Sequence, residues 1–446
     1  MMQLLCNGVR LDLYDNVELQ FKHSNPIFAF DKLECERTTE FKLPATPTND
    51  RVFGLARIPA YNGAGMMVQF PAELQVGTLV RTGYLYVSKY EKDYAAILVT
   101  GEMVKLLAAK EAGNVKDYMS NDTSAYGQIS GYAAQYTLIQ TLRYQNESQA
   151  DPSNPGVSIY VCRDSIVRPC ISLYVMLITY LYQKFNIGGI NNIPQDLRGF
   201  VYIPANCVDS TGQTIETAGT MVYAKYNIPD WTITDVLKIV AYAGGYSVNF
   251  EDGEVSFLNS LADFSGVVDI TKRLTKRDAV SRTILDYAQD NYLNWKDEDE
   301  YRLKGGRAKY NIANANLKSE NQLFEIPMQP ARIGRNSLAL CWDNNSINSF
   351  LPDRPIVPMG SEWLANMVLT QYDLRPFYTD KQIPTNPIVQ AVTDAATQIE
   401  VECRMSMLEY YAIKNTNLII VDNSVYVWTE RSWQNDTAKF TLSKLA

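Results

Sequence analysis

Apolar and polar residues alternate strictly at both ends of this 446-residue chain, and this alternation constrains the fold more than any other feature. Near the N-terminus every second residue of Val9–Leu13 is apolar, and near the C-terminus the same holds for Val401–Met407. A period of two with one apolar face predicts half-buried antiparallel strands. We therefore expect a mainly β protein of the α+β class, with a β-rich region at each end.

The two end regions also resemble each other in the order of their expected strands. In each, a short strand is followed by an aromatic strand, a polar turn and a closing strand. These are Thr78–Val80, Tyr84–Ser88 and Ala95–Val99 at one end, and Leu418–Val421, Val425–Thr429 and Ala438–Leu442 at the other. An internal duplication explains this likeness, and so does chance similarity between two unrelated meanders. If the duplication is real, each chain carries two related small barrels.

Further strands are expected on both sides of this pattern. The remaining alternating or β-rich stretches are Val17–Phe21, Leu33–Cys35, Tyr94–Thr100, Ser424–Glu430 and Lys439–Leu442. Asn7-Gly8 has the composition of a hairpin turn, and turns are also expected at Asp422-Asn423 and at Gln434–Asp436.

The middle of the chain contains helical patterns. Thr232 and Asp235 have the spacing of a capping box, and Gly244-Gly245 ends the helix that would begin there. A hairpin of Tyr246–Phe250 and Glu254–Leu258 follows. Partly helical stretches are also expected at Leu106–Ala112, Tyr132–Tyr144 and Leu173–Phe185.

These patterns predict four regions. Residues 1–105 form an N-terminal β-barrel domain, 106–228 a mixed α/β insertion, and 229–262 the helix-hairpin unit. Residues 263–446 form a C-terminal β-barrel domain with an insertion near 330–375.

Composition argues against several classes of function. Asp and Glu (49) outnumber Lys and Arg (41), so the net charge of −8 lacks the basic excess of a nucleic-acid reader. The first residues do not form a signal peptide, and the apolar stretch Ile171–Tyr182 is too short to span a bilayer. Seven dispersed cysteines without CxxC spacing indicate buried thiols of a protein made in a reducing cytosol.

Catalytic and cofactor motifs are not found either. The single histidine, His23, lies in the turn-like segment Lys22–Pro26, where we expect an exposed loop. The sequence has no phosphate-binding loop, dinucleotide fingerprint, zinc-protease motif or nucleophile elbow. The acidic run within Lys296–Glu300 is typical of a solvated loop. We predict no cofactor, no metal and no enzymatic activity, although hydrolysis by an unmarked pair of carboxylates stays open.

Three stretches of the chain resemble tail hub (baseplate hub) proteins of tailed bacteriophages and related contractile injection systems. They are Cys35–Thr46, Asn227–Lys238 with the hairpin after it, and Glu400–Leu445. Similar stretches occur in tail proteins of phages and prophages of Bacteroides-type bacteria. The matching motifs are turn and packing patterns, and the insertions at 106–228 and 330–375 depart from the family.

The resemblance implies a structural virion protein without an enzymatic module. Hub proteins of this kind are homotrimers in which each subunit contributes two β-barrel tube domains. Three chains then form a pseudo-sixfold ring that joins the sixfold tail tube to a threefold tip. The implied partners are further copies of the chain, a distal tail or tube protein, the tape measure protein, a tail fibre or tip protein, and DNA that passes without specific binding. The implied location is the tail tip or baseplate of a virion made in the host cytoplasm.

Two groups of residues are candidates for contacts in such an assembly. The strands Gly83–Ser88 and Val425–Thr429 are candidate edges for ring closure. Their interface residues would be Tyr84, Tyr86, Tyr426 and Trp428. A compact basic cluster is either a contact for an acidic partner or a solvated strand edge. It consists of Lys272, Arg273, Lys276 and Arg277.

A receptor- or carbohydrate-binding β-protein of a tail tip or cell surface is the alternative. In that case exposed tryptophans would stack on sugars, whereas buried tryptophans would be core residues. The tryptophans concerned are Trp231, Trp342, Trp363, Trp428 and Trp433.

Overall fold

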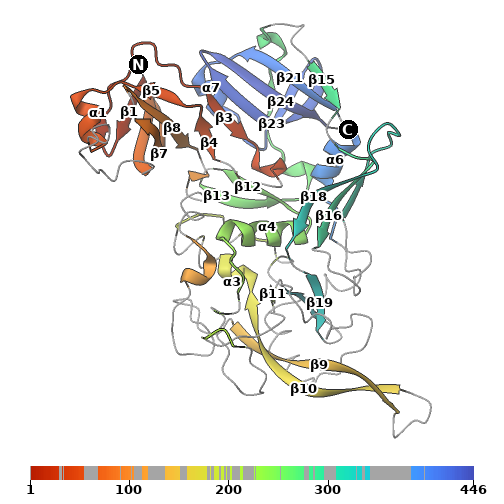
Figure 1. Cartoon of the computed structure of the whole chain (residues 1–446). Coiled ribbons are helices and arrows are strands. Elements are labelled where there is room, and N and C mark those ends of the chain that lie inside the picture. Colours follow the sequence, from red (N-terminus) through yellow and green to blue (C-terminus); the bar gives the residue numbers. More distant parts are fainter. Residues whose placement is uncertain are drawn as a thin grey trace.

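A computed structural model shows a mainly β protein with a few short helices (Figure 1), as the alternation predicts. The residues that the structure describes are 2–29, 33, 35–54, 69–90, 92–101, 103–104, 113–118, 136–150, 158–177, 181, 185–189, 192–194, 197, 201–202, 211–213, 226, 228–251, 253–275, 281–284, 287–295, 308–327, 329–333, 337–341, 383–395 and 397–445.

An N-terminal module is built from antiparallel strands and one short helix. Its elements are β1 (Met2–Cys6), β2 (Val9–Arg10), β5 (Phe41–Leu43), α1 (Pro47–Val52), β6 (Gln69–Val76), β7 (Leu79–Tyr90) and β8 (Tyr94–Thr100). Asn7 and Gly8 take positive φ angles of 50° and 76° between β1 and β2, which confirms the expected turn. The stretches around Leu13 and Val17 run through turns and loops, and Leu33 and Cys35 are not strand residues.

A C-terminal module has a similar composition. Its elements are β14 (Val267–Asp269), β15 (Ser281–Ile284), β21 (Thr397–Arg404), α7 (Met407–Ala412), β22 (Leu418–Val421), β23 (Ser424–Gln434) and β24 (Thr437–Lys444). The strands predicted at this end are confirmed, and so are both turns. Asp422 and Asn423 have φ angles of 47° and 62°, and Asn435 and Asp436 have 48° and 56°.

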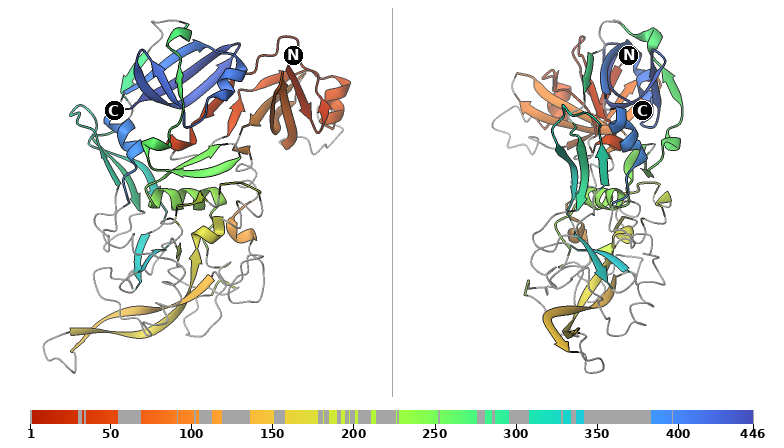
Figure 2. Two further views of the ribbon diagram at one scale, coloured as in Figure 1. Left: turned by 180° about the vertical axis from the view of Figure 1, so that it is seen from behind. Right: turned by 90° about the vertical axis from the view of Figure 1, so that its right-hand side faces the viewer.

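Two strands join the modules into one sheet. They are β3 (Phe21–Ser24), which pairs with β23 of the C-terminal module, and β4 (Glu36–Thr38), which pairs with β8 of the N-terminal module. The resulting path is β15-β21-β24-β23-β3-β4-β8-β7-β6-β1-β2. Figure 2 shows the two modules side by side.

The described strands do not close into barrels, so the two-barrel architecture is not confirmed. The C-terminal module comes nearest to closure. The segment that begins as β14 pairs with β22 and then reaches β21 through a single bridge between Leu274 and Cys403.

The two modules share one order of elements, and we call this shared unit the repeat. Along the chain β3, β4/β5, α1, β6, β7 and β8 follow one another, and β15, β21, α7, β22, β23 and β24 follow in the same order. Both helices have six residues and begin after a hydroxyl N-cap, Thr46 in one and Ser406 in the other. Each hydroxyl accepts a hydrogen bond from the backbone N–H three residues later.

A matching β-bulge sets the register of the repeat. Ser88 is the extra residue where β7 pairs with β8, and Thr429 is the extra residue where β23 pairs with β24. The Ser88 hydroxyl donates to the carbonyl oxygen of Ala95 at 3.2 Å, and the Thr429 hydroxyl donates to that of Thr441 at 3.3 Å. In both ladders the acceptor residue is paired with the residue just after the bulge, so the two bonds are equivalent.

This register corrects the sequence alignment of the two ends. Thr78–Val80 is not a separate short strand, since Leu79 and Val80 begin β7. The residue equivalent to Ala95 is Thr441 rather than Ala438. The aromatic stretches Tyr84–Ser88 and Val425–Thr429 correspond to each other, because each ends at the bulged residue of its strand.

Below the modules lies the helix-hairpin unit, as predicted (Figure 1). Helix α4 (Ile233–Ala243) begins at a complete capping box of Thr232 and Asp235, and Gly244 is its C-cap. Strands β12 (Ser247–Glu251) and β13 (Glu254–Leu258) form the hairpin. The buried side chains of α4 belong to the largest apolar cluster of the described residues. Each of the two modules has a separate apolar core.

The region 106–228 differs from its expectation. Tyr136–Tyr144 is not helical, because it belongs to the strand β9 (Tyr136–Ala150), which pairs along β10 (Ser158–Ser172). Long-range pairing here overrides a local pattern that was compatible with a helix. Helix α3 (Leu173–Leu177) confirms part of the expected Leu173–Phe185 helix, and Leu106–Ala112 lies outside the described residues.

Smaller elements complete the described structure. They are η1 (Pro26–Phe28), η2 (Val115–Tyr118), β11 (Val201–Tyr202), η7 (Leu261–Asp263), η8 (Thr271–Arg273), β16 (Asp290–Trp295), β17 (Ala308–Asn311), β18 (Glu320–Ile326), β19 (Gln329–Ile333), β20 (Ser337–Cys341) and α6 (Pro387–Ala395). Residues 342–382 and the acidic run 296–300 lie outside the described part of the chain. Within that part, no helix has the length and apolar character needed to cross a membrane.

Candidate functional site

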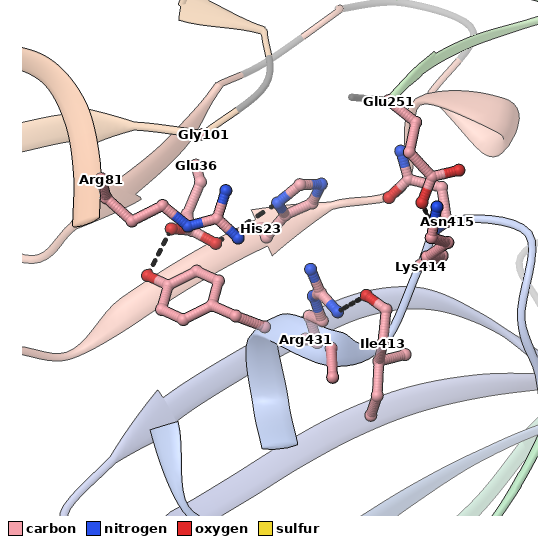
Figure 3. A pocket seen from close by; sticks show the side chains of 11 residues that line it. His23, Glu36, Arg81, Gly101, Glu251, Ile413, Lys414, Asn415 and Arg431 are labelled. Carbon is pink, nitrogen blue, oxygen red and sulfur yellow. Dashed lines mark hydrogen bonds and ion pairs between the residues drawn. The ribbon is translucent and has the colours of Figure 1, made fainter. Parts of the chain in front are cut away.

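A polar pocket of about 150 Å³ lies where the two modules and the β12–β13 hairpin meet (Figure 3). We call it the seam pocket. The described residues that line it are His23, Glu36, Arg81, Gly101, Glu251, Tyr411, Ala412, Ile413, Lys414, Asn415 and Arg431. They come from β3, β4, β7, the end of β12, the C-terminal end of α7 with the loop after it, and β23. The pocket is therefore a product of the joint between the modules.

His23 lies in this pocket and not in an exposed loop, which corrects the sequence prediction. It is part of β3, directly opposite Arg431 of β23, and its side chain is only 9% exposed. Its ring contacts Trp428 edge-on at 5.3 Å between centroids. Within the turn-like segment Lys22–Pro26, the residues up to Ser24 belong to β3, and the strand ends before Asn25, the N-cap of η1.

The protonation of His23 is set by burial. Nδ1 lies 3.5 Å from Oε2 of Glu36, and neither ring nitrogen has a partner within hydrogen-bonding geometry. Desolvation lowers the pKa of His23, and the charges of Arg431 and Arg81 lower it further, against the opposing effect of Glu36. The imidazole is therefore neutral at pH 7.

Glu36 is the buried anion of the pocket. Its Oε1 accepts hydrogen bonds from the hydroxyl groups of Tyr411 (2.6 Å) and Thr100 (3.0 Å). Burial would raise the pKa of Glu36, but the His23 contact, the Arg431 charge and the Tyr411 hydrogen bond outweigh it and lower the pKa. The carboxylate is therefore ionised and joins β4 and β8 of one module to α7 of the other.

Arg431 is the corresponding buried cation. Its Nη1 donates to the carbonyl oxygens of Ile413 (2.6 Å) and Tyr410 (3.1 Å) at the C-terminal end of α7. The Tyr410 carbonyl also accepts from the backbone N–H of the C-cap residue Ile413 at 3.3 Å. Both carbonyls lie at the negative end of the helix dipole, so a guanidinium suits them. The guanidinium also lies 4.5 Å from the ring centroid of Trp428 and 4.6 Å from that of Tyr410.

Arg81 extends this arrangement to β7. Its guanidinium lies 4.2 Å from the ring centroid of Tyr411. Tyr411 therefore stacks against Arg81 and also donates its hydroxyl hydrogen bond to Glu36. Burial raises the pKa of Tyr411 well above its ordinary value, so the hydroxyl keeps its proton.

Asparagine side chains connect the seam pocket to the hairpin. Asn25 donates from Nδ2 to the carbonyl oxygens of Asn415 (3.0 Å) and Trp428 (2.9 Å). Asn415 in turn donates from Nδ2 to Oδ1 of Asn249 and to the carbonyl of Phe250, both at 3.0 Å. These buried amides satisfy one another, which fixes β3, the C-terminal module and β12 in one arrangement.

The chemistry of the pocket is that of a structural joint. Its described lining contains no serine, threonine or cysteine that His23 could activate as a nucleophile. Within the described residues, no three His, Cys, Asp or Glu side chains are grouped as metal ligands. The geometry provides a buried anion, Glu36, that is hydrogen-bonded across the boundary between the repeats, and a buried cation, Arg431, that is hydrogen-bonded within the C-terminal module.

The residues predicted at ring-closing edges lie elsewhere. Tyr84 and Tyr86 are half-buried on β7, which pairs with both β6 and β8. Tyr426 and Trp428 are buried on β23, which pairs with β24 on one side and with β22 and β3 on the other. The prediction that these strands form free edges is therefore wrong, because the meander uses both of their sides.

The basic cluster is only partly described. Lys272 and Arg273 lie exposed in η8, next to α7, and Lys276 and Arg277 lie outside the described residues. Nη1 of Arg273 contacts Oε1 of Glu409 at 2.7 Å, so this residue has an acidic neighbour within the chain. Contact of the cluster with an external partner stays a prediction.

The described tryptophans are structural. Trp231 and Trp428 are 5% and 0% exposed, and half-buried Trp433 donates its indole N–H to the carbonyl oxygen of Met405 at 2.8 Å. Trp342 and Trp363 lie outside the described residues. Trp231, Trp428 and Trp433 therefore offer no exposed stacking platform for a sugar.

Two predicted thiols are buried as expected. Cys6 and Cys403 are fully buried and free, and burial raises the pKa of Cys6 to about 12 and that of Cys403 to about 11. Cys35 is only partly buried. Such pKa values keep both buried thiols protonated and unreactive.

Comparison with known proteins gives matches only among solved structures. No known protein family and no curated protein matches the chain. The 43 kDa tail protein of prophage MuSo2 from Shewanella oneidensis shares 8% identity at a TM-score of 0.40, over 99% of this chain and 98% of that chain. The prophage tail protein gp18 from Listeria monocytogenes EGD-e shares 8% at 0.34, over 99% and 94%. The phage P2 baseplate in its activated conformation with Ca shares 9% at 0.23, over 98% and 89%. At these values the likeness assigns neither a family nor a function to the chain.

Proposed function

We propose that the chain is a non-enzymatic structural protein of a phage tail, a trimeric hub at the distal end that joins the sixfold tube to a threefold tip. The resemblance of Cys35–Thr46, Asn227–Lys238 and Glu400–Leu445 to tail hub proteins suggests this role. The observation that carries the proposal is the internal repeat. A chain with two equivalent modules provides six modules in a trimer, which is what a threefold-to-sixfold adaptor requires.

The seam pocket supports the same role. An adaptor has to hold its two repeats in a fixed relation, or the six modules cannot lie in one ring. The buried Glu36 accepts a hydrogen bond across the boundary from Tyr411, and the β3–β23 pairing continues the sheet through it. Side-chain bonds and backbone ladder together resist hinge motion between the modules.

In this role the chain meets a tube or distal tail protein, the tape measure protein and a fibre or tip protein, and it lines the channel for DNA. The net charge of −8 suits that lining, because phosphates are attracted to basic walls and pass acidic ones without binding. In the assembled ring we expect the bore to carry net negative charge. A net positive bore contradicts the lining role.

Sedimentation velocity of the purified full-length chain tests the trimer. We expect one species with three times the 50.4 kDa of the chain, at micromolar concentration and physiological salt. Glycan-array binding by the same sample tests the alternative receptor- or carbohydrate-binding role. A monomer that binds sugars contradicts the hub, and a trimer without sugar binding supports it.

A further inference from the structure

The seam pocket is positively charged, although the chain as a whole is acidic. Three cationic and two anionic side chains line it, and they are Arg81, Lys414, Arg431, Glu36 and Glu251. Because His23 is neutral at pH 7, the three cations and two anions give the lining a net charge of +1, against −8 for the whole chain. A positive cavity in an acidic protein favours a negatively charged occupant.

The two carboxylates of the lining already have hydrogen-bond donors within the chain. Oε1 of Glu36 accepts from the hydroxyl groups of Tyr411 and Thr100. Oε1 of Glu251 accepts from the backbone N–H of Asn415 at 3.1 Å. The chain itself therefore supplies donors to the anions of the pocket.

Arg431 and His23 are satisfied less completely. Arg431 is 6% exposed, and its Nη1 donates to two carbonyl oxygens while its buried Nε–H has no acceptor. The side chain of His23 is 9% exposed, and neither ring nitrogen has a hydrogen-bond partner. Buried polar atoms in native proteins are nearly always bonded to protein, water or an ion. Both side chains line the pocket (Figure 3), so they indicate a polar occupant there.

The size of the pocket restricts that occupant to a small ion. Its volume of about 150 Å³ equals the liquid volume of about five water molecules. This is well below the ~300 Å³ at which pockets for drug-sized ligands begin. A phosphate-sized oxyanion fits such a volume, and the planar N–H fork of a guanidinium matches the oxygens of an oxyanion.

We propose that the seam pocket binds one small oxyanion of the size of inorganic phosphate, held by Arg431, Lys414 and Arg81. Arg431 on β23 and Lys414 just after α7 belong to the C-terminal module, whereas Arg81 on β7 belongs to the N-terminal module. The bound ion therefore bridges the two modules and adds an ionic connection to the joint between them. The site does not rest on the proposed hub function or on the number of chains in the assembly.

Phosphorus-31 NMR of inorganic phosphate tests the site on the purified full-length protein. We expect the protein to broaden the phosphate resonance at pH 7.5, and the broadening to saturate as phosphate is added. An excess of sulfate, another tetrahedral oxyanion, should remove the broadening, whereas chloride at the same ionic strength should not. No broadening, broadening without saturation, or equal competition by chloride overturns the proposal.

Two variants change the charge of the lining in opposite directions. Lys414→Met removes an exposed cation, so the dissociation constant for phosphate should rise about fivefold. Glu251→Gln removes an anion but keeps an oxygen that can accept from Asn415, so the dissociation constant should fall by a similar factor. Tighter binding cannot result from a damaged fold, which makes the second variant the stricter test.

Lys439→Met is the matched control. Lys439 is a 60% exposed cation on β24 of the C-terminal module and does not line the pocket, so its loss should leave the affinity unchanged. Equal affinities in all three variants mean an adventitious ion only, bound anywhere on the surface, and overturn the site. Weaker binding in both Lys414→Met and Glu251→Gln also overturns it, because charge is then not the cause. These affinities are measured on whatever oligomer the chain forms, so failure of the hub function leaves the test intact.

Discussion

At the scale of single residues, the most informative feature is a pair of buried titratable side chains, Glu36 and His23, that local sequence patterns place on the surface. The alternation around Cys35 puts Glu36 on a solvent-facing side, and the turn-like context of His23 indicates an exposed loop. Both are buried because β3 and β4 lie between the modules. His23 is paired with Arg431, some 400 residues away in the sequence, and no local sequence pattern can predict a pairing between such distant residues.

Acid should weaken the folded state through His23. Because its folded-state pKa is lowered, the unfolded chain binds more protons at moderately acidic pH. Its contribution is fully present above the unfolded value of about 6.5 and is lost as pH falls from there through the folded-state pKa. We expect the free energy of unfolding in urea to decrease between pH 7 and pH 5.5.

The variant His23→Gln is the control for this pH dependence, because the chain has no other histidine. In that variant the slope between pH 7 and pH 5.5 should disappear. Glu36 contributes separately at lower pH: its lowered pKa stabilises the fold above the unfolded value, and this contribution is lost as pH falls through the folded-state pKa. An unchanged slope in His23→Gln contradicts the assignment to His23.

Two arginines contact α7 and should differ in their importance. Arg431→Met removes two buried charge-assisted hydrogen bonds to α7 carbonyls, and we expect a loss of about 3 kcal/mol in the free energy of unfolding. Arg273→Met removes a half-exposed ion pair with Glu409, which should change that free energy by less than ~1 kcal/mol. Urea denaturation of the two variants measures the difference, and equal losses contradict the role of Arg431.

At the scale of elements, local rules succeed where the element is stabilised locally. The α4 helix begins at its expected capping box, and β22 is confirmed at Leu418–Val421, next to a turn whose residues adopt positive φ. Local rules fail at β9, where pairing along β10 decides the conformation. The bulges were also missed, because a bulge is a property of two paired strands and not of one.

The equivalence of the bulges can be measured. Thr429→Val and Ser88→Ala each remove the hydroxyl hydrogen bond to the carbonyl of the partner strand, together with one side-chain contact, from Gln398 to Thr429 and from Ser88 to Glu40. We expect each variant to lose about 1 kcal/mol of stability. Thr429→Ser keeps the hydroxyl and should lose less than Thr429→Val. A large loss in one module with none in the other contradicts a shared bulge.

At the scale of the whole molecule, the repeat relates the sheet path to an assembly. The sequence shows the likeness of the two ends, but only the strand pairings show that β3 and β15 are corresponding strands, one used within the chain and one at its edge. The seam pocket and the β3–β23 pairing fix the repeats relative to each other. A protein built in this way is suited to closed rings with twice as many modules as chains.

Electron cryo-microscopy of the purified full-length protein tests this account most directly. We predict a closed ring of three chains in which N-terminal and C-terminal modules alternate, so that six similar β modules surround one bore. Particles that contain a single chain, or a ring in which like modules are adjacent, would contradict it.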